Sequence, residues 1–101
     1  MTTTDAVVID VIKRVAKVDS EALLFFIGDS VSRGMLSSYA HIGQHSEASW
    51  EYYTQDTRAP ASEHEQRQCE RLLEEWRDMP DPVEYRVAKR INAKKLSDSW
   101  T

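Results

Sequence analysis

Within the first thirty residues, hydrophobic side chains alternate with polar ones in one segment and form a continuous run in another. Both patterns predict strands. Residues 7–17 (VVIDVIKRVAK) are rich in β-branched side chains, and Ile9 and Val11 fall on one side by period-two counting. Residues 21–28 are apolar on both sides, which is typical of a central strand. Residues 18–20 offer a turn between the two segments. The pattern therefore predicts a β-hairpin.

A loop rich in glycine and serine leads from this hairpin to further structure. Residues 35–43 (MLSSYAHIG) alternate well enough to predict a third strand. Ser46 or Ser49 could then cap a short helix. We expect that helix to carry Trp50 and Tyr53 into the core.

The clearest helical signal begins at Ser62. Ser62 and Glu65 match a capping box, in which the serine caps the first turn and the glutamate reaches back to the cap. The prolines within residues 79–82 end the helix. One buried stripe of about four turns is predicted from apolar side chains at helical spacing, namely Cys69, Leu72, Leu73 and Trp76.

The remaining pattern predicts a last strand and a tail. Residues 83–91 (VEYRVAKRI) alternate as a strand, and residues 92–101 read as a flexible C-terminal tail. Trp100 in that tail could dock on the body of the protein, which we favour slightly, or on another chain. We thus expect one compact α+β domain over residues 1–91, of order β-β-β-α-β. It would hold a mostly antiparallel sheet with one amphipathic helix packed on one face.

The amino-acid composition narrows the class of protein and leaves the predicted fold unchanged. The chain has 101 residues, 41% hydrophobic and 30% charged, and one cysteine, Cys69, so no disulfide forms within it. No apolar run approaches the roughly 18 residues of a membrane span. The N-terminus lacks the basic and apolar regions of a signal peptide. We therefore expect a cytoplasmic protein.

The charge of −4 is unevenly distributed. Residues 47–84 contain eleven acidic and four basic residues, a balance of −7, whereas residues 85–97 contain five basic residues and no acid. Both could be solvated faces that partly neutralise each other, or they could be two distinct binding surfaces. The basic stretch is the candidate nucleic-acid surface and comprises Arg86, Lys89, Arg90, Lys94 and Lys95.

Residues 26–34 (FIGDSVSRG) resemble the first motif block of the GDSL serine hydrolases, in which Ser30 would be the nucleophile of an esterase. That family also needs a GxND-like block and a C-terminal DxxH, which supply the oxyanion donor and the base. The only asparagine is Asn92, the last histidine is His64, and no DxxH occurs. We therefore interpret Ser30 as a turn residue and predict no catalytic residues.

The histidine spacing does not predict a metal site. His41 and His45 are four residues apart, which on a strand is about 13 Å. His64 and Cys69 are five apart on a predicted helix, which is also poor ligand geometry. We expect no metal and no cofactor.

A longer segment resembles a different group. YAHIGQHSEAS (39–49), the tyrosine pair at 52–53, TRAPA (57–61) and the capped helix are similar to short, mostly uncharacterised proteins of tailed bacteriophages and prophages. The helix departs from that pattern because HEQ stands at 64–66, where a tyrosine is expected. The resemblance implies an accessory protein in the cytoplasm of the host bacterium, and it implies no reaction.

Three functions follow as hypotheses: a non-enzymatic protein-binding module that inhibits a host or defence factor, a nucleic-acid binder, and, remotely, an esterase. A homodimer through the edge of the strand at 83–91 is also a candidate assembly. The candidate partner-binding residues come from the signature, the linker and the acidic helix, and are Tyr39, His41, Gln44, His45, Tyr52, Arg58, Glu70 and Glu74. Of these, Tyr52 and His45 are expected to be exposed.

Overall fold

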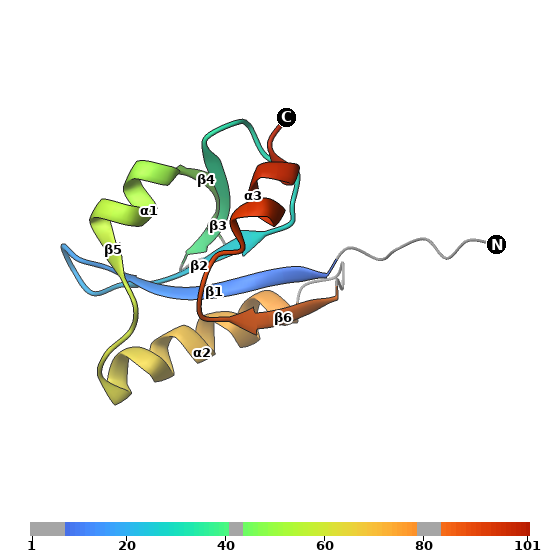
Figure 1. Ribbon diagram of the computed structural model, residues 1–101. Helices are drawn as coiled ribbons and strands as arrows, with labels where there is room; N and C mark the ends of the chain where they lie inside the picture. The colour runs from blue at the N-terminus through green and yellow to red at the C-terminus, as the bar shows by residue number, and fades with distance from the viewer. Residues whose placement is uncertain (1–7, 41–43, 79–83) are drawn as a thin grey trace.

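One curled β-sheet with helices on both faces forms the protein (Figure 1). The computed structural model describes residues 8–40, 44–78 and 84–101. Within these ranges six strands occur in the order β4-β3-β2-β1-β5, with β6 also paired to β1. They are β1 (Ile9–Ala16), β2 (Ala22–Ile27), β3 (Met35–Ala40), β4 (Gln44–Ser49), β5 (Thr57–Arg58) and β6 (Tyr85–Ala88). The predicted α+β class with a mostly antiparallel sheet is confirmed.

The predicted hairpin forms the centre of the sheet. β1 and β2 pair antiparallel, with Ile12 opposite Phe25 and Asp10 opposite Ile27. Alternate side chains of both strands enter different cores, and Val11 and Phe25 are both fully buried. Burial on two faces explains why the sequence of β2 shows a continuous apolar run rather than alternation.

The antiparallel order continues from β2 to β3 and then to β4. β3 covers the described part of the predicted third strand, whose residues 41–43 lie outside the described residues. β4 was not predicted, because residues 44–49 are mostly polar and we expected only a helix cap there. Its pairing with β3 supplies the missing stabilisation, and the Ser38 hydroxyl adds a 3.1 Å hydrogen bond to the Ser46 carbonyl.

Two short strands share the outer edge of β1. β5 pairs antiparallel with Val15 and Ala16, and β6 pairs parallel with residues 9–12. β6 is shorter than the strand predicted at 83–91: residues 89–91 are described but lie outside the strand, which ends at Ala88. The Arg14 side chain of β1 also binds β5. It donates hydrogen bonds of 3.0 and 2.8 Å to the hydroxyl and carbonyl oxygens of Thr57.

Helix α2 (Glu63–Arg77) covers one face of the sheet, while α1 (Trp50–Asp56) and α3 (Ala93–Ser99) cover the other (Figure 1). The α2 core contains Leu72 against β1 and β2, and Trp76 stacks on Phe26 with ring centroids 4.7 Å apart. The opposite core contains Tyr53 and Leu96. The sequence predicted α2 on one face and a short helix that carries Tyr53 into the core; it did not predict α3 or a second layer on the opposite face.

Local signals at the two earlier helices behave largely as predicted. Ser62 caps α2, and the capping box with Glu65 is present. Ser49 caps α1 by accepting a hydrogen bond from the Tyr52 amide. Tyr53 is buried as expected, but Trp50 remains 37% exposed. The expectation that Trp50 lies in the core is therefore wrong, because Trp50 stacks on the outer side of Tyr53 at 5.6 Å instead.

The expected loose tail is a docked helix, so that prediction does not describe the structure. Asn92 caps α3, and Leu96 and Ser99 are buried. The Trp100 indole donates a 2.8 Å hydrogen bond to the Met35 carbonyl, and its backbone forms a bridge with Val31. Docking of Trp100 on the body is confirmed. The segment lacks an apolar run, and two anchors hold it: the buried Leu96 and the partly buried Trp100.

We expect Leu96→Ala to lower the free energy of unfolding by about 2 to 4 kcal/mol, because it removes a buried side chain from the second core. Urea unfolding followed by circular dichroism measures the change. Lys94→Ala, on the solvent side of the same helix, is the control and should shift stability by no more than about 0.5 kcal/mol. Equal small effects of both variants would contradict a docked α3.

Candidate functional site

A hollow of about 470 Å³ lies between the β1–β2 turn and α2. Its volume is within the range of about 300 to 1,000 Å³ that is typical of small-ligand pockets. Both polar and apolar side chains line it: Ser20, Glu21, Ala22, His64, Gln68, Arg71, Leu72 and Glu75. None of these eight was among the binding residues predicted from the sequence, because the turn and the helix are more than forty residues apart in the chain.

The β1–β2 turn holds its side of the hollow in a defined shape. Ser20 adopts a left-handed conformation with φ 60°, and its amide donates to the Ala16 carbonyl at 2.8 Å. The Glu21 amide donates to the Asp19 carboxylate at 3.0 Å, and the Glu21 carbonyl accepts from the Ala16 amide at 2.9 Å. These bonds use the backbone of Glu21 and leave its carboxylate at the rim.

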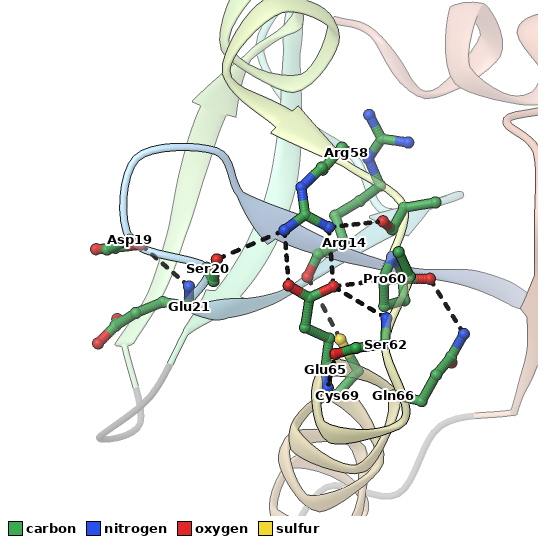
Figure 2. A network of polar contacts seen from close by, with 12 residues as sticks. Arg14, Asp19, Ser20, Glu21, Arg58, Pro60, Ser62, Glu65, Gln66 and Cys69 are labelled. Atoms are coloured by element: carbon green, nitrogen blue, oxygen red, sulfur yellow. Dashed lines mark hydrogen bonds and ion pairs between the residues drawn. The ribbon is translucent and has the colours of Figure 1, made fainter.

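Arg58 joins the turn to the start of α2, as Figure 2 shows. Its guanidinium forms a two-pronged ion pair with Glu65 at 2.8 and 2.6 Å and also contacts the Ser20 hydroxyl at 3.5 Å. The Glu65 carboxylate accepts further hydrogen bonds from the amides of Ala61 and Ser62. Mainly through the Arg58 hydrogen bonds, the pKa of Glu65 is lowered from 4.5 to about 2. Arg58, a predicted partner contact, thus binds the start of α2 and contacts the β1–β2 turn beside the hollow.

The signature segment approaches the other end of the hollow. Tyr39 is only 1% exposed, and its hydroxyl donates a 2.9 Å hydrogen bond to Glu75. Tyr39 is therefore a core residue that orients a lining carboxylate. In the register, Tyr39 stands opposite His45 and Ala40 opposite Gln44. His41 and the side chains of Gln44 and His45 lie outside the described residues.

The outer face of α2 carries the two acidic candidates. Glu70 and Glu74 are both exposed, four residues apart on one side of the helix, and neither forms an ion pair with another described residue. Tyr52, half-buried rather than exposed, lies elsewhere, in a hollow of about 420 Å³ together with Lys17, Val18 and Asp56. The structure therefore does not bring Tyr52 to the α2 surface.

Three of the five candidate nucleic-acid contacts pair with carboxylates of the chain itself. Arg86 and Lys95 bind Asp10 at 2.6 and 3.0 Å, and Lys94 binds Asp98 at 3.2 Å on the surface. Lys95 also donates to the Val8 carbonyl. Lys89 and Arg90 are exposed and have no carboxylate partner among the described residues.

Asp10 is the residue that sequence reasoning missed. It is 1% exposed, and an acidic residue within the apolar run VVIDVI was the available signal, because a buried carboxylate requires cations. Burial alone raises the pKa of Asp10, but hydrogen bonds from Arg86 and Lys95 outweigh it and hold the pKa below its ordinary 3.8. The cluster joins β1, β6 and α3.

Ser30 is exposed in the loop between β2 and β3. The amide of the next residue, Val31, donates a hydrogen bond to the backbone of α3. His64 lies on α2 and lines the hollow beside the β1–β2 turn. The described residues contain no group of three or more histidine, cysteine, aspartate or glutamate side chains arranged to hold a metal ion. Among the helices described, none has the length and apolar character required to span a bilayer.

We expect Asp10→Asn to lower the free energy of unfolding at pH 7 by about 2 kcal/mol, less than the roughly 3 to 5 kcal/mol for breaking a fully buried pair, because Arg86 reaches solvent. Since folding lowers the pKa of Asp10, its contribution is complete above about pH 4 and is lost as the pH falls further.

Urea unfolding between pH 7 and pH 2.5 measures this dependence. The wild-type protein should lose its advantage over Asp10→Asn as the pH falls through that window. Asp29→Asn, which changes a loop carboxylate without an ion pair in the described structure, is the control. A constant difference between wild type and Asp10→Asn at every pH would contradict the assignment.

Comparison with known proteins assigns no family to the chain. No protein-family model matches the chain, and no curated protein and no solved structure matches it either.

Proposed function

We propose that this chain is a small phage-type accessory protein that acts as a non-enzymatic binding module for another protein. Its main support is the outer face of α2, where Glu70 and Glu74 are exposed and unpaired within the described structure. The inner face of the same helix is fully used by the core, with Cys69 and Leu72 buried. The helix is thus packed on the sheet, while two carboxylates that have no ion-pair partner among the described residues lie on its outer face.

The partner surface that fits this face is basic. Exposed carboxylates attract a positive surface during encounter and penalise a negative one, so they contribute to association rate and specificity. The phage-type resemblance suggests that the partner is a host or defence factor, and that binding inhibits it. The activity would then reside in occupation of a surface and would require no reaction.

Nucleic-acid binding through the basic stretch is the second reading, with less support. Arg86 and Lys95 already neutralise Asp10, which reduces the charge that they could offer to phosphates. Lys89 and Arg90 are exposed and have no carboxylate partner in the part of the chain that the structure describes. Pairing of two β6 edges into a homodimer would bring these same cations of both copies close together, so we place self-association third.

The double variant Glu70→Lys/Glu74→Lys should weaken the partner complex by about tenfold or more, since it replaces attraction by repulsion at a basic surface. The tagged protein is incubated with nuclease-treated bacterial lysate, retained proteins are quantified by mass spectrometry, and the affinity of the purified partner is measured by calorimetry. Thermal unfolding of the variant should remain close to that of the wild type, because both side chains are exposed.

A matched variant, Glu51→Lys/Glu84→Lys, makes the same charge change at two exposed sites away from α2. It should retain the partner. Equal binding by both double variants would overturn the assignment to α2. If proteins are retained from untreated lysate but not from nuclease-treated lysate, the result would favour the nucleic-acid hypothesis.

A further inference from the structure

The hollow beside α2 has apolar, acidic and donor groups in its lining. Ala22 and Leu72 provide an apolar floor, and Leu72 is only 4% exposed. The carboxylates of Glu21 and Glu75 enter from opposite walls, one from the turn and one from the helix. The donors are grouped along α2 and at the turn, and are His64, Gln68, Arg71 and Ser20.

Both carboxylates retain capacity for a ligand. Glu75 accepts one hydrogen bond, from Tyr39 at 2.9 Å, whereas an ionised carboxylate offers about four lone-pair positions. The hydrogen bonds of Glu21 within the described structure involve its backbone alone. Two negative groups with acceptor capacity to spare therefore line the same open hollow.

The position of these carboxylates is built into the fold. Tyr39 is a fully buried core residue that fixes Glu75, and Arg58 holds the turn that carries Glu21 against the start of α2. A pre-positioned pair of acceptors costs less ordering on binding than flexible surface carboxylates do. These two glutamates and the pair on the outer face, Glu70 and Glu74, are all exposed, but only Glu21 and Glu75 line a hollow, and Glu75 is held by the Tyr39 hydroxyl.

We propose that the hollow receives a single lysine or arginine side chain from an extended segment of the protein partner. Its charged end lies between Glu21 and Glu75, and its aliphatic stem lies on Ala22 and Leu72, as long cationic side chains cover apolar surface. Arg71 donates to peptide carbonyls that flank the inserted residue. The inference rests on the proposed protein-binding function and specifies what that surface selects.

Other occupants fit less well. An anionic group would face two carboxylates, and a metal ion would lack a third acidic or histidine ligand in a suitable position among the described residues. A purely apolar side chain would fill the floor but would bury Glu21 and Glu75 without a charge partner, which is unfavourable. The combination of floor, acceptors and donors selects a cation on an aliphatic stem.

The test uses three small probes that differ only in their side chain: the N-acetyl, N′-methylamide derivatives of lysine, arginine and norleucine. Each is titrated into the ¹⁵N-labelled protein and followed by amide chemical shifts. The lysine and arginine probes should give saturable shifts at residues 20–22 and 68–75, with dissociation constants of about 1 to 10 mM. Norleucine, which has the stem without the charge, should bind at least about tenfold more weakly.

Glu21→Gln/Glu75→Gln should reduce the affinity for the lysine and arginine probes by about tenfold or more. Glutamine at 75 can still accept from Tyr39, so the fold is preserved. Glu51→Gln/Glu84→Gln removes the same charge elsewhere and should leave binding unchanged. Equal binding of norleucine, or indifference to the Glu21 and Glu75 changes, would overturn the inference.

The same variants separate this inference from the proposed function. If the probes do not bind the hollow but reversal of Glu70 and Glu74 still releases a partner, the hollow assignment fails and the binding function stands. If the probes bind through Glu21 and Glu75 but reversal of Glu70 and Glu74 releases nothing, the hollow stands and the outer-face assignment fails.

Discussion

The buried carboxylate of Asp10 is the constraint on which the arrangement of the C-terminal third depends. It occupies the central strand β1 and is 1% exposed, so an unpaired charge there would be strongly unfavourable. Arg86 comes from β6 and Lys95 from α3, and both bind this one carboxylate. The last two elements must therefore return to β1 beside each other. Arg86 and Lys95 are used in this way to bind Asp10, whereas Lys89, Arg90 and Lys94 of the basic stretch stay exposed.

Two-sided burial of the β1–β2 hairpin has a consequence for the surface. α1 and α3 complete one core and α2 completes the other, so the described helices use their apolar sides internally. The exposed features that remain on α2 are polar: a pair of free carboxylates and an adjacent hollow with mixed lining. Surfaces of this kind recognise charge and shape more than apolar area, which favours a specific, polar contact over a large apolar one.

Sequence patterns identified the elements with strong local signals. The hairpin, the Ser62–Glu65 capping box and the stripe containing Leu72 depend on spacing and caps within a few residues, and the structure confirms them. β4 and α3 have weak local signals, because Ser-rich and Lys-rich segments gain their stability from pairing with β3 and from the anchors Leu96 and Trp100. The hydrophobic periodicity of a short segment carries no information about the contacts that the segment makes with residues far away in the chain.

The residues of the candidate site also divide into those that the sequence predicts and those that only the tertiary structure brings together. The sequence by itself determined that acidic side chains lie on an amphipathic helix, because helical spacing separates Glu70 and Glu74 from the buried stripe. Only the tertiary structure decided that Tyr39 is internal, that Arg58 positions Glu65, and that Glu21 and Glu75 share a hollow. Those relations join residues far apart in the chain, and the physical reason is that the pairing of strands and the packing of α2, rather than local propensity, set the distances between them.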